Sequence, residues 1–344
     1  MTDLRFQALT QWCKSQLSDE SIQLDVVSDD ASFRRYFRIH ANTASLNPLC
    51  HQPLIAVDAP PDKENSSKFI AIAAGLDAHG VKVPRIIKSS ETQGFMILDD
   101  FGDDLLFSHL NDLTVDNYYQ QAMQSLLHLK DCSSMTTYQL PAYNEQLLNS
   151  EMLLFSEWFL AKHLGFKEPK IKFPELDSVF KLLIQSAVDQ PQVCVHRDFH
   201  CRNIMLLKTS ELGIIDFQDA VLGPITYDLV SLLKDCYISW PREKVVAWVE
   251  DYYNHLVKAK HSEIDNVEQF IRWFDFMGMQ RHIKVLGIFA RLNYRDNKPA
   301  YLNDMPMTLN YLIECCSYYP EFKDFGESLK SKVLPFLKNR FVNE

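Results

Sequence analysis

The first hundred residues contain short apolar stretches with the alternation and residue types of β-strands. Runs rich in β-branched and aromatic residues predict strands over Gln23–Ser28, Arg34–His40, Leu54–Asp58, Arg85–Ser89 and Gly94–Leu98. Between the third and fourth strands, the apolar residues of Lys63–His79 recur at helical spacing, and Gly80 follows as a stop signal. The pattern therefore predicts a small β-rich unit that carries a helix.

The pattern becomes mainly helical after the acidic segment Asp99–Asp104. One insert interrupts the helical region, with three short strands predicted over Val193–Val195, Ile204–Leu207 and Leu212–Ile215. Because no internal repeat or long flexible linker is present, we expect one α+β unit of two lobes rather than two independent domains. Residues 1–100 form the small N-terminal lobe in this prediction, and residues 101–344 form the larger, mainly helical C-terminal lobe.

The composition narrows the class of protein. Of the 344 residues 47% are hydrophobic, enough for a large core, but no apolar run is long enough to span a bilayer. The formal net charge of −10 argues against sequence-independent binding to nucleic acid, which requires a basic face. The eight cysteines include no Cys-x-x-Cys pair, and the N-terminus lacks the features of a secretory signal. These features predict a cytoplasmic protein with reduced thiols, and they indicate no membrane, nucleic-acid or obligate protein partner.

The segment Val195–Leu206 carries the polar residues that best match a chemical function. Apolar strands flank a polar loop in which Asp198 precedes Asn203 by five residues, and the next predicted hairpin leads to Asp216. Phosphoryl transfer requires a carboxylate that accepts the proton of the attacking hydroxyl, and oxygen ligands that hold Mg²⁺ on the phosphates. One Asp or Asn alone more often caps a helix or forms a turn, but the ordered set favours the catalytic interpretation. We therefore predict a protein-kinase-like fold that transfers the γ-phosphoryl group of ATP.

Neighbouring polar residues have supporting roles in this hypothesis. His196 and His200 flank Asp198, but no further His or Cys stands at metal-ligand spacing, so His196 is predicted to hydrogen-bond the loop and His200 is unassigned. Asp228 suits the positive N-terminal end of a predicted helix, and it is also a candidate for bracing the catalytic loop. This helix begins only eleven positions after Asp216, too few for the activation segment and peptide-docking platform of a protein kinase. The spacing favours a small-molecule acceptor.

These motifs resemble the aminoglycoside phosphotransferase superfamily, and within it the bacterial anomeric kinases of N-acetylmuramate and N-acetylglucosamine. The resemblance covers most of the chain, through SDDASFRRYFRI (Ser28–Ile39), VDAPP (Val57–Pro61), VKVPRI (Val81–Ile86), VHRDFHCRNIML (Val195–Leu206), IDFQDAVLGPITYDLVSLLKDCYISWP (Ile215–Pro241) and MGMQRHIKVLGIFARLNYRDNKPAYLND (Met277–Asp304). The catalytic motif identifies only the superfamily, whereas the first and last two stretches narrow the subgroup.

The resemblance implies a role for each motif residue. Asp198 becomes the catalytic base, and Asn203 and Asp216 become the ligands of Mg²⁺ beside ATP. The residues whose backbone is implied to bind the adenine are Asp99, Asp100 and Phe101. The implied reaction is attack of the anomeric hydroxyl of an N-acetylated amino sugar on the γ-phosphate, which yields a sugar 1-phosphate and ADP in the recycling of cell-wall sugars.

Two departures from the general kinase pattern concern phosphate binding. The turn Ser28–Ser32 contains no glycine, so Ser32 and Arg34 are predicted to contact the phosphates instead. The third strand carries no lysine for the α- and β-phosphates, and Asp58 falls at or beside that position. The candidates for replacing the lysine are Arg34, Arg35, Lys63 and Lys68.

A row of basic residues is predicted on one face of the helix around Met277–Tyr294. Arg281, Lys284, Arg291 and Arg295 recur with helical spacing, and we call these four residues the basic stripe. The stripe suits an acceptor cleft in which Arg281 and Arg291 hold the carboxylate of N-acetylmuramate. A solvated face with ordinary surface ion pairs is the other interpretation, and the sequence leaves both open.

Two other functions are open on the sequence alone. Phosphorylation of an aminoglycoside or another small alcohol fits the same superfamily, although the basic stripe suits a polycationic acceptor poorly. A nucleotide-binding pseudokinase is suggested by the missing lysine and glycines. The joint presence of Asp198, Asn203 and Asp216 favours an enzyme over a pseudokinase, because a binding module needs no base.

Overall fold

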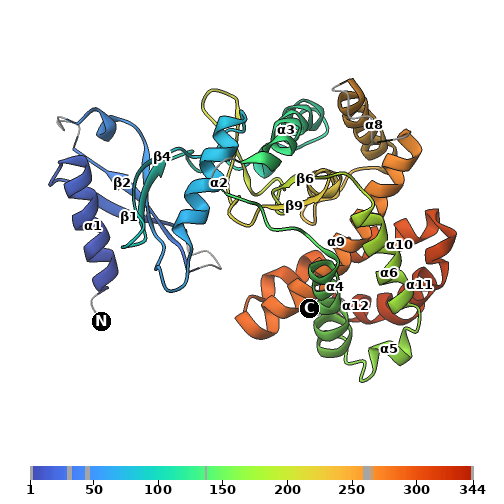
Figure 1. The fold of residues 1–344 in the computed structure, drawn as a ribbon. Coiled ribbons are helices and arrows are strands. Elements are labelled where there is room, and N and C mark those ends of the chain that lie inside the picture. The colour runs from blue at the N-terminus through green and yellow to red at the C-terminus, as the bar shows by residue number, and fades with distance from the viewer. Residues whose placement is uncertain are drawn as a thin grey trace. The chain divides into compact units, whose positions relative to one another are not determined.

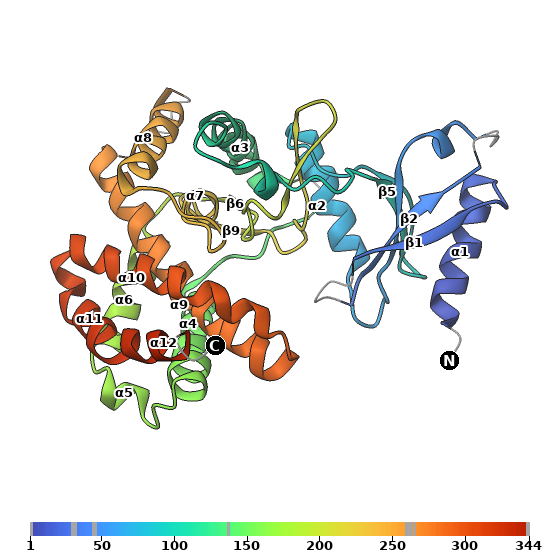
Figure 2. The ribbon, with the colours of Figure 1, turned by 180° about the vertical axis from the view of Figure 1, so that it is seen from behind.

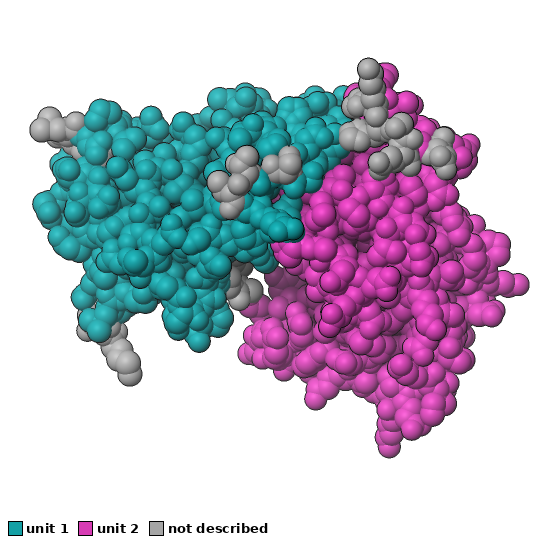
Figure 3. All heavy atoms as spheres, in the orientation of Figure 1, with its two compact units in different colours: residues 1–140, 201–220 teal, residues 141–200, 221–344 magenta. Residues whose placement is uncertain are grey.

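The computed structural model describes residues 3–28, 33–42, 47–135, 138–258, 264 and 266–341. The chain forms two compact units, which Figure 3 shows in different colours. Unit 1 consists of Met1–Leu140 and Cys201–Ala220, and unit 2 consists of Pro141–His200 and Val221–Glu344. Each unit is therefore built from two separate segments of the chain. The lobe boundary at residue 100 stays a prediction.

Unit 1 is built on a five-stranded antiparallel sheet with the strand order β1-β2-β3-β5-β4. The strands are β1 (Gln23–Ser28), β2 (Arg35–His40), β3 (Leu54–Asp58), β4 (Ile86–Ser90) and β5 (Phe95–Asp99). Each lies within one residue of its predicted bounds. The prediction succeeds because β-branched and aromatic residues at alternating positions suit a pleated surface that is buried on its faces.

Helices cover both sides of this sheet. α1 (Leu4–Leu17) packs its buried residues, among them Leu9 and Cys13, against one face that includes Phe37 and Ile97. α2 (Ser66–Ala78) lies on the opposite side of the sheet in Figures 1 and 2. The helix begins at Ser66 rather than at the predicted Lys63, because the side chain of Asn65 caps it by accepting a hydrogen bond from a backbone N–H.

Asp58, at the end of β3, is fully buried and ion-paired with two arginines. Arg5 of α1 and Arg35 of β2 both bond its carboxylate, with Nε–O distances of 2.9 and 3.1 Å. A buried carboxylate requires such partners, and in satisfying it the two arginines tie α1 and β2 to β3. The aspartate that replaces the expected lysine therefore has a structural function in the N-terminal sheet.

The second segment of unit 1 supplies a short hairpin. β7 (Ile204–Leu206) pairs antiparallel with β8 (Leu212–Ile214). The N–H of Leu206 donates to the carbonyl of Asp104 at 2.8 Å, and the N–H of Ile214 donates to the carbonyl of Lys82 at 2.7 Å. Both strands of the hairpin are thus bonded to the first segment. The rest of unit 1 contains α3 (Val115–Leu129) and the 3₁₀ helices Pro48–His51, Leu106–His109 and Lys130–Ser134.

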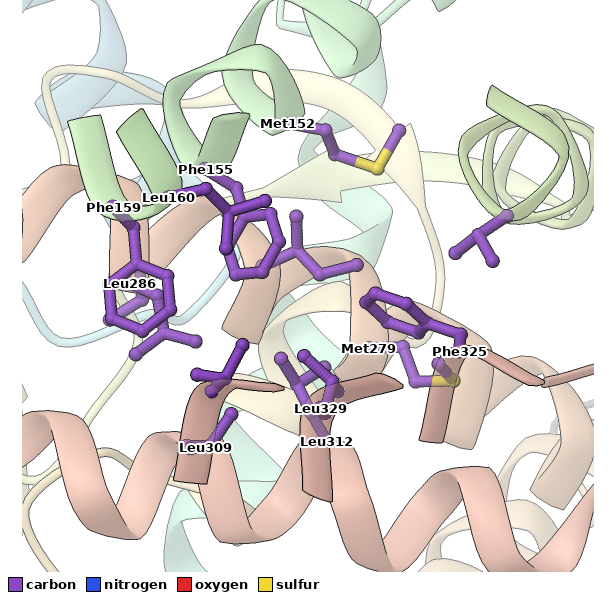
Figure 4. Close-up of a cluster of buried hydrophobic side chains, with 14 of the residues drawn as sticks. Met152, Phe155, Phe159, Leu160, Met279, Leu286, Leu309, Leu312, Phe325 and Leu329 are labelled. Carbon is purple, nitrogen blue, oxygen red and sulfur yellow. The ribbon is translucent and has the colours of Figure 1, made fainter. Parts of the chain in front are cut away.

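Unit 2 is mainly helical. Its α-helices are α4 (Glu145–Leu154), α5 (Pro169–Lys172), α6 (Leu176–Val188), α7 (Tyr227–Leu233), α8 (Arg242–Lys258), α9 (Val267–Asp296), α10 (Met305–Tyr318), α11 (Lys323–Ser328) and α12 (Leu334–Phe341). Shorter π and 3₁₀ segments cover Phe155–His163, Pro299–Asp304, Pro320–Phe322 and Leu329–Val333. Figure 4 shows side chains from α4, α9, α10 and the C-terminal segments meeting in one apolar core.

The 30-residue helix α9 is the centre of unit 2. Every residue from Trp273 to Gly287 is buried, because other elements surround this part of the helix on all sides. At Gly287 the helix lies so close to the chain at Leu154 that a Cβ atom would stand 2.4 Å from the Leu154 carbonyl carbon. None of the helices formed by the described residues is long and apolar enough to cross a membrane.

One strand of a second small sheet precedes the loop that contains Asp198. β6 (Gln192–Val195) pairs antiparallel with β9 (Val221–Pro224). The three predicted strands of this region are present, but they form two separate two-stranded sheets with the additional strand β9. β9 was missed because it ends in Gly223 and Pro224, a pair typical of turns.

Candidate active site

Unit 1 contains a cavity of about 240 Å³, which we call the unit 1 cavity. Ile55 and Leu98 line it from the sheet, and Met205 and Ile215 line it from the segment that contains the β7–β8 hairpin. The other lining residues are Val27, Tyr36, Phe69, Pro84, Asp99, Asp100, Phe101, Gly102, Asn203, Asp216 and Phe217. Apolar walls with a few polar groups at the edge are typical of ligand cavities, and they suit a flat aromatic base.

The three predicted adenine-binding residues form one edge of the unit 1 cavity. The carboxylate of Asp99 is ion-paired with Arg85 at 2.7 Å, and that of Asp100 with Arg38 at 2.5 Å. The backbone N–H groups of both aspartates already donate to carbonyl oxygens, at 3.1 and 3.0 Å. Among the described residues, the backbone N–H of Phe101 has no such acceptor. Phe101 is therefore the member of the three that retains a backbone donor.

Asn203 and Asp216 meet at one end of the β7–β8 hairpin. The Ile215 N–H donates to the carbonyl of Asn203 at 3.1 Å, and the Asn203 side-chain amide lies 3.4 Å from the Asp216 carboxylate. Asp216 has a φ of 64°, which is uncommon outside glycine and concentrated at functional sites. Across the described chain, no three His, Cys, Asp or Glu side chains are grouped to hold a metal. One carboxylate and one amide oxygen nevertheless suit Mg²⁺, which takes its remaining ligands from phosphates and water.

The predicted phosphate-binding residues have mixed outcomes. Ser32 lies outside the described residues. Arg34 is buried, pairs with Glu64 at 2.8 Å, and lies over the ring of Phe69. The remaining candidate cations are ion-paired too: Arg35 with Asp58, Lys63 with Asp62, and Lys68 with Asp219. The phosphate-binding roles of Ser32 and Arg34 stay predictions.

The loop after β6 is held by Asp228, at the start of α7. The carboxylate of Asp228 accepts hydrogen bonds from the N–H groups of His196 at 2.6 Å and Arg197 at 3.0 Å. The ring of His196 accepts a hydrogen bond from the N–H of Asp198 at 3.3 Å. Burial raises the pKa of Asp228 to about 6, although His196 and the two N–H groups favour its ionised form. These contacts are of the kind predicted for His196 and Asp228, and their contribution to catalysis stays a prediction.

Asp198 lines a cavity of unit 2, which we call the unit 2 cavity. Arg281 and Lys284 of α9 share its wall. The other lining residues are His200, Tyr227, Cys236, Tyr237, Val285, Ile288, Phe289, Leu292 and Tyr301. Burial alone would raise the pKa of Asp198, but nearby charges, that of Lys284 foremost, outweigh it and hold the pKa below its ordinary value. Asp198 is therefore ionised at neutral pH and can accept a proton as well as a hydrogen bond.

The basic stripe falls into two environments. Arg281 and Lys284 are only 4% and 7% exposed, so the interpretation as a solvated face does not hold for them. Arg291 is partly buried and does not line the unit 2 cavity, and Arg295 is exposed and ion-paired with Asp296 at 2.8 Å. The difference arises because the middle of α9 passes through the core of unit 2, whereas its last turns leave it.

Two residues close to the predicted site residues were missed from the sequence. Gln218 donates a hydrogen bond to the Asp216 carboxylate at 2.6 Å. Its position two residues after the aspartate is the sequence feature from which this contact could have been predicted. Glu151 accepts hydrogen bonds from Tyr143 and Arg197 deep in unit 2. Nothing in the sequence distinguishes Glu151 from an exposed helical glutamate, because its partners are distant in the chain.

Comparison with known proteins identifies the family. The phosphotransferase enzyme family model matches residues 23–265, and the chain belongs to this family. It is 38% identical to an N-acetylmuramate/N-acetylglucosamine kinase of Pseudomonas aeruginosa over 339 residues, 96% of this chain and 97% of that protein. A protein of Neisseria meningitidis serogroup B with the same name is 35% identical and covers 91% of each chain.

Solved structures agree with this assignment at the level of the fold. The ADP-bound aminoglycoside phosphotransferase APH(2'')-Ib matches with a TM-score of 0.58 and 15% identity, over 91% of this chain and 99% of that one. Choline kinase from Cryptosporidium parvum matches with a TM-score of 0.62 and 10% identity, over 93% of this chain and 97% of that one. The predicted two-lobed, kinase-like α+β fold and the resemblance to the phosphotransferase superfamily are confirmed.

Proposed function

We propose that this protein transfers the γ-phosphoryl group of ATP to the anomeric hydroxyl of N-acetylmuramate, N-acetylglucosamine or both. The observation that carries the proposal is the identity of 38% over 96% of the chain with a kinase named for these two sugars. The unit 2 cavity supports it, because an ionised aspartate and two buried cations share its wall. The products are ADP and a sugar 1-phosphate.

Asp198 is the proposed catalytic base. As the anomeric oxygen bonds to the γ-phosphorus, its proton passes to the Asp198 carboxylate, and the bond from that phosphorus to the β–γ bridging oxygen breaks to release ADP. His196 and Asp228 support this step through their hydrogen bonds to the loop. The low pKa of Asp198 suits an anomeric hydroxyl, which is more acidic than an ordinary alcohol and needs only a weak base.

The unit 1 cavity is the proposed nucleotide site. The apolar walls take the adenine, and Phe101 supplies the backbone N–H that hydrogen-bonds it at the edge formed by Asp99 and Asp100. Asn203 and Asp216 are the proposed ligands of Mg²⁺, which when bound would neutralise charge on the phosphates. Gln218 and the backbone bond between Ile215 and Asn203 keep the two ligands at one end of the hairpin.

Arg281 is the proposed partner of the carboxylate of N-acetylmuramate. Its guanidinium is buried in the cavity wall and donates a weak hydrogen bond to the sulfur of Cys236 at 3.6 Å. Within the described ranges, no carboxylate lies within ion-pair distance of it. A buried cation without an ion-pair partner favours an anionic ligand. Arg291 remains the second candidate for this role.

A coupled ADP-release assay tests the proposal with N-acetylmuramate, N-acetylglucosamine and a panel of aminoglycosides, each with MgATP. We expect turnover with one or both sugars, and phosphorus NMR should identify an acid-labile 1-phosphate. A sugar reduced at its anomeric centre should not react. Turnover only with aminoglycosides, or a stable 6-phosphate, would contradict the proposal. ATP binding without turnover on any acceptor would indicate a pseudokinase.

A further inference from the structure

Glu151, on α4, is a buried carboxylate surrounded by hydrogen-bond donors and cations. The residue is only 8% exposed, and its carboxylate accepts hydrogen bonds from the hydroxyl of Tyr143 and the guanidinium of Arg197. The ammonium of Lys284 lies 3.2 Å from the same carboxylate. A charge buried to this degree is tolerated only when it is paired and hydrogen-bonded, and Glu151 meets both conditions.

Arg197 connects Glu151 to the catalytic loop. Arg197 directly precedes Asp198 and has a φ of 79°, a conformation that is costly for a residue other than glycine. Its backbone N–H is held by Asp228, and its guanidinium is held by Glu151 and lies over the ring of Tyr143. The residue next to the proposed base is therefore fixed at its backbone and at its side chain.

Lys284 connects Glu151 to the unit 2 cavity. α4 lies alongside α9 in Figures 1 and 2, and this packing places Glu151 within reach of a lysine that shares the cavity wall with Asp198. Lys284 also donates to the hydroxyl of Tyr227 at 3.0 Å. Of the charges that lower the pKa of Asp198, that of Lys284 lowers it most.

We propose that Glu151 is a positioning residue for phosphoryl transfer, because its carboxylate holds Arg197 and the Lys284 ammonium together and so keeps Asp198 placed and ionised in the cavity wall. The inference rests on the proposed function. In this proposal turnover requires Lys284 in its protonated, ammonium form. Glu151 keeps Lys284 in that form. Neither residue is required to touch the nucleotide.

A purely structural cluster elsewhere in unit 2 provides a matched control. Asp275 is a fully buried carboxylate that pairs with Lys234 at 3.0 Å and Arg242 at 2.5 Å, and it accepts a hydrogen bond from Tyr319. The partner types are the same as those of Glu151: one lysine, one arginine and one tyrosine. Asp275 does not line the unit 2 cavity. Its removal should therefore affect stability without changing the titration of Lys284.

The two interpretations of Glu151 differ in the pH dependence of turnover. Burial lowers the pKa of Lys284, but Tyr227 and Glu151 outweigh it and raise the pKa above its ordinary value. Without the charge of Glu151, burial and the positive charge of Arg197 should make Lys284 lose its proton at lower pH. The charged and titratable groups that face Lys284 or share its cavity wall are Tyr143, Glu151, Arg197, Asp198, His200, Tyr227, Cys236, Tyr237, Arg281 and Tyr301.

The test measures kcat against pH for the full-length wild type, Glu151→Gln and Asp275→Asn, with folding checked by circular dichroism at each pH. We expect the basic limb of the Glu151→Gln profile to move toward neutral by about 1 pH unit or more. The KM for ATP should change less than about threefold, because Glu151 does not line the unit 1 cavity. The Asp275→Asn profile should keep the wild-type limb.

A second substitution identifies the titrating group. Lys284→Arg in the Glu151→Gln background introduces a guanidinium that stays protonated, so it should remove the shifted limb. The inference would be overturned if the shifted basic limb of the kcat–pH profile persists in this double variant. It would also be overturned if the basic limb of Glu151→Gln matches that of wild type. If Glu151→Gln does not fold, Lys284→Met takes its place: we expect lower kcat at an unchanged KM for ATP, and unchanged kcat would overturn the inference. A wild type without turnover would instead refute the proposed function.

Discussion

Replacing Arg281 with methionine removes a buried positive charge from the unit 2 cavity and keeps much of the side-chain volume. N-acetylmuramate carries a carboxylate and N-acetylglucosamine does not, so the two sugars respond differently if Arg281 binds that carboxylate. With N-acetylmuramate, the variant loses a charge-assisted hydrogen bond in a site that water screens poorly, because Arg281 is only 4% exposed. With N-acetylglucosamine, no such bond exists to be lost.

The expected magnitude follows from the burial of the pair. A hydrogen bond to a charged group contributes about 1.5–3 kcal/mol, and burial of Arg281 places this bond in the upper part of that range. A loss of about 2–3 kcal/mol corresponds to a decrease in kcat/KM of roughly 30- to 150-fold for N-acetylmuramate. The decrease for N-acetylglucosamine should stay below about tenfold, because the charge of Lys284 still lowers the pKa of Asp198 and the base stays ionised at pH 8.

The assay compares kcat/KM for the two sugars in wild type, Arg281→Met and Arg295→Met at pH 8 with saturating MgATP. Arg295 lies on the same helix but is exposed and paired with Asp296, so Arg295→Met should leave the ratio of the two values unchanged. Equal losses with both sugars in Arg281→Met would refute the assignment of Arg281 to the carboxylate. The ratio of the two kcat/KM values is informative even if the variant is less stable, because partial unfolding lowers both values by the same factor.

Three further predictions concern carboxylates described above. Asp198→Asn should lower kcat by about 10²–10⁴-fold with nearly unchanged nucleotide affinity. Asp216→Asn should lower kcat and also weaken Mg-dependent nucleotide binding in calorimetry. Equal losses of folding stability in both variants, without these effects, would identify both aspartates as structural. The pKa of Asp228 is about 6 in the folded protein, compared with an ordinary value of 3.8 for an aspartate. Between these two pH values the folded protein binds a proton that the unfolded chain does not. The contribution of Asp228 to the free energy of unfolding therefore falls as the pH rises from about 4 to 6. In urea unfolding measured across this pH range, the free energy of unfolding of Asp228→Asn should fall less with rising pH than that of wild type. An identical pH dependence in the two proteins would contradict the assignment. Asp58→Asn should lower the free energy of unfolding by about 1–3 kcal/mol, less than the loss of a fully buried ion pair, because both of its arginine partners are more than one third exposed. A loss of nucleotide binding in a folded variant would argue against its structural role.

The strands of unit 1 were predictable, and the proposed catalytic motif could be found, because their signals are local. Alternating β-branched residues define β1 to β5, and the order of Asp198, Asn203 and Asp216 is recorded directly in the sequence. Asp58 was located correctly but not explained. Its partner Arg5 stands 53 positions away, so only the folded sheet shows that its carboxylate is satisfied.

The environment of α9 was the least predictable part of the site. Helical spacing places Arg281, Lys284, Arg291 and Arg295 on one face, and charged faces are usually solvated. Burial of the first two depends on how α4, α7 and α10 pack around the helix, which is a tertiary property that spacing does not contain. Glu151 was missed for the same reason, since its cation partners follow it by 46 and 133 positions.

The division of unit 1 into two chain segments limits how this enzyme can be dissected. The chain passes between the units three times, after Leu140, His200 and Ala220. A fragment that ends at Leu140 would keep the whole five-stranded sheet but would lack Asn203, Asp216 and one wall of the unit 1 cavity. The proposed nucleotide site is therefore not a detachable N-terminal module. Chimaeras between relatives must exchange residues 1–140 and 201–220 together, as matched inserts rather than as one continuous piece.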